Sequence, residues 1–202
     1  MKFFLFLFRH GSTEGNLVKK YIGATDEALC DIGREEVRKE REMLLASKER
    51  AGEEYRKIIA EKRKIFSSPM LRAKETASIL FPDNPIQIEM GLNEMNFGLF
   101  EKKNFSEMNK DPFLSPLYQS WLDSNCTAQC PEGESKASFS KRICSSFAEL
   151  ANREHFALNE VVPLVCHGGT INSLLERFAK TKKDYFEWRT LHGDFRLEEI
   201  EL

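Results

Sequence analysis

The 202-residue chain has few of the features that mark secreted, membrane-spanning or nucleic-acid-binding proteins. Its five cysteines are an odd number without framework spacing, which argues against a disulfide-stapled module. No apolar run approaches the roughly 18 residues of a membrane span. Lys and Arg (30) nearly balance Asp and Glu (32), and the net charge of -2 offers no general attraction to nucleic acids or anionic membranes. We therefore expect a cytoplasmic protein that binds neither.

Apolar residues are plentiful enough to build a folded core. They make up 41% of the chain and include 16 phenylalanines, which together with the small net charge argues against disorder. One apolar run, Phe3 to Phe8, looks like the start of a signal peptide, but it is shorter than the roughly 7–15 residues of that signal and ends at Arg9 and His10. A short run that is apolar on both alternations is typical of a strand buried on both faces. We expect it to be the first, central strand.

Strands and helices are expected to alternate along the chain. Further strands are expected at 64–67, 86–90 and 161–166, with an edge strand at 195–202. Helices are expected at 33–47 with Asp31 as cap, at 69–80 with Ser68 as cap, at 135–152 and at 170–179. This alternation predicts a three-layer α/β/α sandwich with a mostly parallel central sheet, forming one domain over residues 1–202.

One segment interrupts the alternation. Residues 104–130 are broken into short helical pieces by Pro112, Pro116 and Pro131. We expect an insertion that lies over the sheet edge, within a lid-like segment at about 99–131. The charge-rich stretch 34–64 is interpreted as a solvated helical face, not as a nucleic-acid patch.

Chemically unusual residues follow four of the expected strands at the point where each strand ends. Arg9 and His10 end the first strand, and Arg72 lies shortly after the second. Glu94 follows the third strand and His167 follows the fourth. Because ligands of open α/β sheets bind at the carboxyl ends of the strands, we expect these five side chains to meet at one rim.

Such a set is suited to phosphoryl transfer. Two guanidiniums can bind a dianionic phosphate through paired hydrogen bonds, and their charge lowers the pKa of a nearby histidine. A neutral imidazole can then attack phosphorus, while a glutamate protonates the departing alkoxide and later activates water. The second histidine and glycine amides at a helix N-terminus can hold the remaining phosphate oxygens. The cationic side chains supply the charge, so we expect no metal and no other cofactor.

These residues also lie in motifs that carry a family resemblance. The first motif, LFRHGSTEGN, is similar to an RHGxTxxN signature. The other motifs follow in order: YIGATD at 21–26, SSPMLRA at 67–73, LNEMNFG at 92–98, PEGES at 131–135 and HGGT at 167–170. Together they resemble the histidine phosphatase superfamily, in its phosphoglycerate-mutase-like branch.

The resemblance implies a role for each residue of the rim. His10 would be the phosphorylated nucleophile and Glu94 the proton donor and acceptor. Arg9, Arg72 and His167 would form the phosphate pocket. Further substrate-binding residues implied by the resemblance are Asn16, Thr13, Gly23, Thr25 and Gly168. The binding partner would be a small-molecule phosphomonoester. The sequence does not indicate which oligomeric state the protein has.

Within the superfamily the chain looks most like α-ribazole phosphatase-like enzymes. The similarity rests on the YIGATD stretch, the HGGT block and the tail from Tyr185 to Phe195. A phosphoglycerate mutase must also grip the carboxylate end of its substrate, and no arginine lies between Arg72 and Arg142. This favours a hydrolase. A cofactor-dependent phosphoglycerate mutase, a broad-specificity phosphatase and a non-catalytic phosphate-binding module stay open as alternatives.

Two positions depart from the family pattern: Glu132 and Lys102 stand where glycine is usual, in the lid-like region. Cys126 and Cys130 are four residues apart but lack a second ligand pair, so we interpret them as ordinary thiols, not as zinc ligands.

Two histidines and three aromatic residues are left without an assigned role. His155 and His192 have no partner pattern and are interpreted as surface or loop histidines. For Tyr118, Trp121 and Trp188, packing is favoured over stacking on a base.

Overall fold

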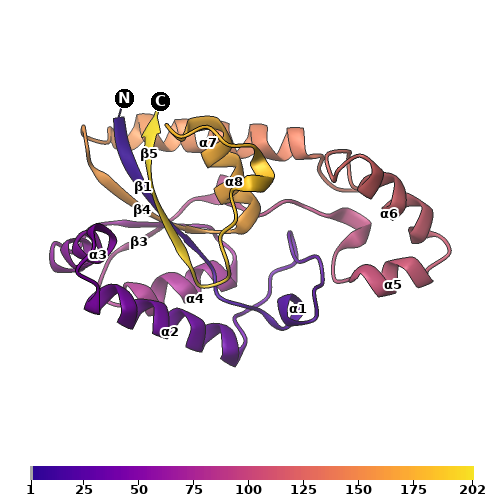
Figure 1. The fold of residues 1–202 in the computed structure, drawn as a ribbon, viewed down its shortest axis with the longest axis horizontal. Coiled ribbons are helices and arrows are strands. Elements are labelled where there is room, and N and C mark those ends of the chain that lie inside the picture. The colour runs from indigo at the N-terminus through magenta and orange to yellow at the C-terminus, as the bar shows by residue number, and fades with distance from the viewer. Residues whose placement is uncertain (1) are drawn as a thin grey trace.

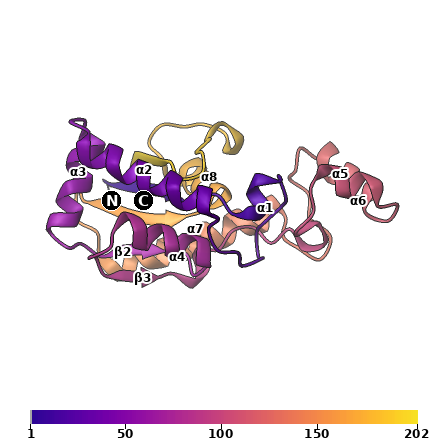
Figure 2. The same ribbon diagram turned by 90° about the horizontal axis from the view of Figure 1, so that it is seen from below.

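The computed structural model describes residues 2–202 and shows a five-stranded sheet with helices on both faces (Figures 1 and 2). The strands are β1 (Lys2–Arg9), β2 (Ile65–Ser67), β3 (Ile86–Ile88), β4 (Val161–Cys166) and β5 (Phe195–Glu201). The α-helices are α1 (Glu14–Leu17), α2 (Asp31–Ala46), α3 (Arg50–Ala60), α4 (Leu71–Leu80), α5 (Phe105–Lys110), α6 (Leu114–Asp123), α7 (Lys136–Glu154) and α8 (Gly168–Phe178). Short 3₁₀ turns are η1 (Met90–Leu92), η2 (Gly98–Phe100) and η3 (Tyr185–Glu187).

The sheet has the strand order β3-β2-β4-β1-β5. The pairs β1/β4, β2/β4 and β2/β3 are parallel, and β5 is antiparallel to β1. The predicted three-layer, mostly parallel architecture is therefore confirmed. β5 forms an edge, as the sequence indicates. β1, expected to be the central strand, lies inside the sheet between β4 and β5, and the middle strand is β4.

Two hydrophobic cores lie on opposite faces of this sheet. Phe3, Leu5 and Leu7 of β1 pack into the core formed with α7 and α8. Phe6 and Phe8 pack into the second core, with α2, α3 and α4. The phenylalanines and leucines of β1 are thus buried on both faces of the sheet. This is why apolar and polar residues do not alternate along the strand.

Helix α7 has the sequence features that predict it. Ser135 caps its N-terminus, and its side chain accepts a hydrogen bond from the Ser138 amide. The apolar stripe of the helix is buried as expected; it comprises Phe139, Ile143, Phe147 and Leu150.

Several helices differ from expectation, among them α8, which begins at Gly168 rather than at about Thr170. Cys30, not Asp31, caps α2, because its sulfur accepts from the Gly33 amide at 3.3 Å. Helix α4 begins at Leu71 rather than at Pro69. The Ser68 hydroxyl, expected as its cap, lies 2.7 Å from Nε2 of His167 instead. Helix α1 is a short addition within a stretch expected to be loop.

The insertion does not lie over the sheet edge as expected. Helices α5 and α6 project away from the sheet beyond α1 in both views (Figures 1 and 2). The reason is aromatic packing: the Tyr21 ring lies 5.6 Å from Trp121, and its hydroxyl is 3.0 Å from that of Tyr118. Within residues 2–202, no helix combines the length and apolar character needed to cross a membrane.

Candidate active site

The five residues expected at the strand ends are brought together at one rim of the sheet. His10 follows β1, and Arg72 lies in the first turn of α4, just after β2. His167 is the N-cap residue of α8, directly after β4. The rings of His10 and His167 are 5.1 Å apart, and Arg72 Nε lies 3.3 Å from His167 Nδ1.

His10 is held with one ring nitrogen free. Its Nδ1 lies 2.7 Å from the Gly11 carbonyl oxygen, which can only accept, so Nδ1 carries the proton. The lone pair is then on Nε2. Burial, followed by the positive charges of Arg72 and Arg9, lowers the pKa of His10 well below its usual value. His10 is therefore a neutral imidazole with an available nucleophilic nitrogen.

His167 has the opposite tautomer. Arg72 Nε can only donate, so His167 Nδ1 accepts, and the proton lies on Nε2, 2.7 Å from the Ser68 hydroxyl. Burial, then Arg72, lowers the pKa of His167 well below its usual value. His167 is thus neutral and fully buried beside His10.

Arg72 is fully buried and held by a loop. Its Nη1 donates to the Thr25 carbonyl at 2.8 Å and its Nη2 to the Gly23 carbonyl at 2.9 Å. The Glu101 carboxylate in turn accepts from the backbone amides of Gly23, Thr25 and Ala24 at 2.9–3.2 Å, and from the Thr25 hydroxyl at 2.7 Å. A single carboxylate therefore fixes the loop that positions Arg72.

Arg9 is held from the other side, by residues just before β5. Its Nη1 donates to the Thr190 carbonyl at 2.8 Å, and its Nη2 lies 2.7 Å from His192 Nε2. Arg9 Nε is buried and has no hydrogen-bond partner within residues 2–202. His192 lies in a turn, as the sequence indicates, but the sequence did not show its partners: besides Arg9, its ring lies 5.5 Å from that of His10.

Glu94 is anchored by amides on either side. Its Oε1 accepts from the Met95 amide and its Oε2 from the Gly169 amide, both at 2.9 Å. A Cβ atom at Gly169 would lie 2.4 Å from Oε1, so only glycine allows this approach. Arg142, which the sequence did not single out, donates to the Glu94 carbonyl at 3.3 Å.

A cavity of about 360 Å³ opens beside Arg9 and Glu94. Most of its wall is aromatic or apolar, and its charged lining residues are Arg9, Glu94 and Lys136. The aromatic lining residues are Tyr21, Phe97, Trp121, Tyr185 and Phe186. His10, Arg72 and His167 are buried and are not part of this lining. The arrangement places a cluster of two arginines and two histidines, chemically suited to an anion, at one end of an aromatic cleft.

The residues expected to bind substrate are divided by the structure. Gly168 lines the cavity, with Arg9 in close contact. Thr13 and Asn16 cap each other: Thr13 N donates to Asn16 Oδ1 at 3.1 Å, and Asn16 N donates to Thr13 Oγ1 at 3.2 Å. Gly23 and Thr25 hold Arg72 through their carbonyls. These four residues lie outside the cavity lining and contribute to the scaffold of the site.

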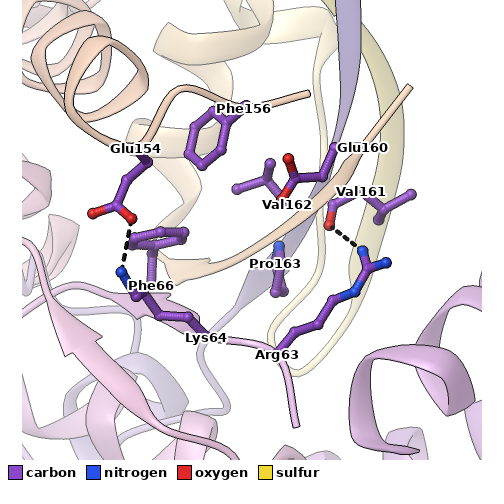
Figure 3. A pocket seen from close by; sticks show the side chains of 9 residues that line it. All are labelled: Arg63, Lys64, Phe66, Glu154, Phe156, Glu160, Val161, Val162 and Pro163. Atoms are coloured by element: carbon purple, nitrogen blue, oxygen red, sulfur yellow. Dashed lines mark hydrogen bonds and ion pairs between the residues drawn. The ribbon is translucent and has the colours of Figure 1, made fainter. Parts of the chain in front are cut away.

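A second cavity, of about 300 Å³, lies at the opposite end of the sheet, where β2 and β4 begin (Figure 3). Its charged side chains already have partners in the protein: Lys64 Nζ is 2.7 Å from Glu154, and Arg63 Nη1 donates to the Val161 carbonyl. No nucleophile or histidine lines it. We assign it no role in the chemistry.

Comparisons with known proteins agree with the fold. A family model described as the histidine phosphatase superfamily (branch 1) matches residues 5–201. No curated protein matches the chain. A putative alpha-ribazole-5'-P phosphatase from Escherichia coli K-12 is similar in structure, with a TM-score of 0.79 and 24% identity, over 98% of this chain and 91% of that chain.

Two further solved structures are also similar. The alpha-ribazole phosphatase from Shigella flexneri has a TM-score of 0.74 and 24% identity, over 98% of this chain and 89% of that chain. A phosphoserine phosphatase from Entamoeba histolytica, solved with 3-phosphoglyceric acid, has a TM-score of 0.69 and 26% identity, over 96% and 89% of the two chains.

Proposed function

The chain belongs to branch 1 of the histidine phosphatase superfamily, and on that premise we propose that it hydrolyses phosphomonoesters through a phosphohistidine at His10. One observation carries the proposal. The Gly11 carbonyl fixes the His10 proton on Nδ1, which leaves the Nε2 lone pair free, and burial with the charges of Arg72 and Arg9 lowers the pKa of the ring. A neutral nucleophile beside an anion-binding cluster is what attack on a phosphate ester requires.

In the first step, His10 Nε2 attacks phosphorus and the bond from phosphorus to the ester oxygen breaks. Arg9 and Arg72 bind the phosphate oxygens and stabilise the charge that builds up on them, and His167 orients Arg72 by accepting a hydrogen bond from its Nε. Glu94 lines the cavity from which the leaving group departs, so it is placed to donate a proton to the alkoxide.

In the second step, a water molecule replaces the leaving group in the cavity. Glu94, now ionised, takes a proton from this water, whose oxygen attacks phosphorus and breaks the bond to Nε2. Inorganic phosphate leaves and His10 returns to its neutral form. The guanidiniums supply the positive charge throughout, so we propose that the reaction needs no metal.

The cavity favours a hydrolase over a mutase. A mutase must also bind the carboxylate of phosphoglycerate, and the cationic lining residues are Arg9 and Lys136. Lys136 Nζ is 2.8 Å from Glu176 Oε1 and lies over the Tyr185 ring, so its charge is already compensated. A broad-specificity phosphatase fits this cavity as an alternative, because no second charged group of the substrate is required.

The aromatic wall supports a substrate whose leaving group has a flat apolar surface. Trp121 and Tyr185 line the cavity together with Phe97 and Phe186. Aromatic side chains of this kind bind rings in offset or edge-to-face contacts. We propose α-ribazole 5′-phosphate, or a similar phosphomonoester with an aromatic group, as the substrate.

The proposal is tested by measuring phosphate release at mildly acidic and neutral pH in the presence of EDTA. The substrates are para-nitrophenyl phosphate, α-ribazole 5′-phosphate, phosphoglycerates and a sugar phosphate, and the control is His10→Ala. We expect release that EDTA does not diminish, that His10→Ala abolishes, and that is fastest with the aromatic substrates. Isomerisation of 3-phosphoglycerate without release of phosphate would show a mutase. Neither phosphate release nor isomerisation would favour a binding module.

A further inference from the structure

We propose that His192 is a positioning residue of the phosphate pocket: as a neutral imidazole it accepts a hydrogen bond from Arg9 and fixes the guanidinium in the orientation that receives the phosphoryl group. The inference rests on the proposed function of this site. It adds a third histidine to His10 and His167.

The position of His192 follows from the strand pairing. Strand β5 pairs with β1 from Lys2 to Phe8, and Phe195 lies opposite Phe8. The turn before β5 therefore meets the end of β1. Two backbone bonds hold it there: Arg9 N donates to the Asp194 carbonyl at 3.0 Å, and Gly193 N donates to the His10 carbonyl at 3.1 Å. The two residues that follow His192 are thus hydrogen-bonded to the backbone of Arg9 and of the nucleophile.

The hydrogen bond to Arg9 determines the protonation state of His192. A guanidinium has only donors, so His192 Nε2, at 2.7 Å from Arg9 Nη2, must carry a lone pair. The proton of the neutral ring is then on Nδ1. Burial, followed by the charges of Arg9 and Arg72, lowers the pKa of His192 to about 3, which keeps the ring neutral at working pH.

Arg9 is thereby fixed at both terminal nitrogens. Nη1 donates to the Thr190 carbonyl, and Nη2 donates to His192. Thr190 is itself buried, and its hydroxyl accepts from Arg196 Nε at 2.9 Å, which anchors the turn to β5. The remaining donors of the guanidinium, including the unpartnered Nε, are left for an anion. A guanidinium that is already oriented loses less entropy when it binds phosphate.

Two substitutions distinguish the effect of the hydrogen-bond acceptor at His192 from the effect of side-chain volume. His192→Gln retains an acceptor near the position of Nε2, whereas His192→Leu fills similar space without one. The matched control is His155→Asn, at the exposed C-terminal end of α7, where the left-handed conformation tolerates asparagine. Each protein is titrated with inorganic phosphate and with orthovanadate by calorimetry, and KM and kcat are measured with para-nitrophenyl phosphate.

We expect His192→Leu to weaken binding of both anions and to raise KM by about tenfold, because a hydrogen bond to a charged group is lost. KM should change more than kcat, since Arg9 binds the phosphate group of the substrate before the chemical step. His192→Gln should stay within about threefold of the wild type, and His155→Asn should match it. Equal affinities in all variants would overturn the inference, as would equal losses in the leucine and glutamine variants.

A second measurement needs no substitution. In a ¹H–¹⁵N spectrum of the wild-type histidine rings at pH 7, His192 should show a protonated Nδ1 and an unprotonated Nε2. The resonances are assigned by their absence in His192→Gln. A charged ring, or a proton on Nε2, would overturn the inference even if His192→Leu did not fold.

The outcomes distinguish this inference from the proposed function. If the wild type binds phosphate but releases none from any ester, the proposed hydrolysis is wrong, and the role of His192 is still decided by the affinities. If the wild type hydrolyses esters and His192→Leu binds anions as tightly, only the role of His192 is wrong. If the wild type neither binds nor hydrolyses, both are wrong.

Discussion

Replacement of Glu101 by alanine should damage both the stability and the activity of the protein, although this carboxylate does not line the cavity. Glu101 accepts hydrogen bonds from the amides of Gly23, Ala24 and Thr25, from the Thr25 hydroxyl and from the Phe97 amide at 3.0 Å. Without it, the buried Gly23 amide loses its partner, which costs about 1–3 kcal/mol, and the partly buried groups lose about 0.5–1.5 kcal/mol each.

We therefore expect the free energy of unfolding to fall by about 3 kcal/mol or more in urea titrations. The Gly23 and Thr25 carbonyls are the acceptors for Arg72, so a loosened loop also misplaces the guanidinium. A misplacement of about 1 Å can cost roughly 100-fold in rate, and we expect kcat/KM to fall about 10- to 100-fold.

The control is Glu42→Ala, on the exposed face of α2, where the carboxylate has no hydrogen bond or ion pair within the described chain. It should change the free energy of unfolding by less than about 0.5 kcal/mol. A loss of stability in Glu101→Ala with unchanged kcat/KM of the folded fraction would refute the coupling from Glu101 to Arg72. If Glu101→Ala lowers the free energy of unfolding by less than about 1 kcal/mol, the loop amides do not depend on this carboxylate for their stability.

Three further results are expected. Lys102→Gly and Glu132→Gly should each stabilise the protein by up to about 1 kcal/mol in thermal melts, because these residues have φ of 62° and 59°; destabilisation by either would contradict this. Glu94→Gln should release a burst of para-nitrophenol and then turn over about 100-fold or more slowly, since water is no longer activated; no burst with normal turnover would exclude this role. The three site histidines have lowered pKa values, so below about pH 6.5 the unfolded chain binds more protons than the folded one. Stability should fall with decreasing pH by up to about 4 kcal/mol per pH unit, and a flat profile from pH 7 to 5 would contradict this.

The fold and the core of the site are predictable because their signals are local. A run that is apolar on both alternations indicates a buried strand, and the residue after such a strand lies at the ligand-binding rim. Arg9, His10 and His167 follow directly from this rule. The alternation of strands and helices similarly fixes the layers without knowledge of any contact.

The supports of the site have no local signal. Glu101, Arg142 and His192 act on residues about 50 to 180 positions away in the sequence, so only the folded chain shows their partners. The direction of the insertion is set in the same way, by the contact of Tyr21 with Trp121. A helix begins at another residue than predicted where the expected capping side chain has a tertiary partner. Ser68, for example, contacts His167.

The two departures from the family pattern gain a physical meaning from the backbone. Lys102 and Glu132 both adopt the left-handed conformation that favours glycine. The family's glycines at these positions are thus explained by backbone geometry. This chain keeps the same turns with residues that strain them.

The placement of β1 between β4 and β5 has a consequence for how the protein is made. Both neighbours of the first strand come from the last 42 residues of the chain, with Phe4 paired to Val161 and to Glu199. During synthesis, the apolar β1 therefore leaves the ribosome long before either partner exists, and contacts of such long sequence separation fold slowly. Nascent chains should expose this strand to chaperones and to aggregation. A chain stalled before β5 should leave β1 without its antiparallel partner.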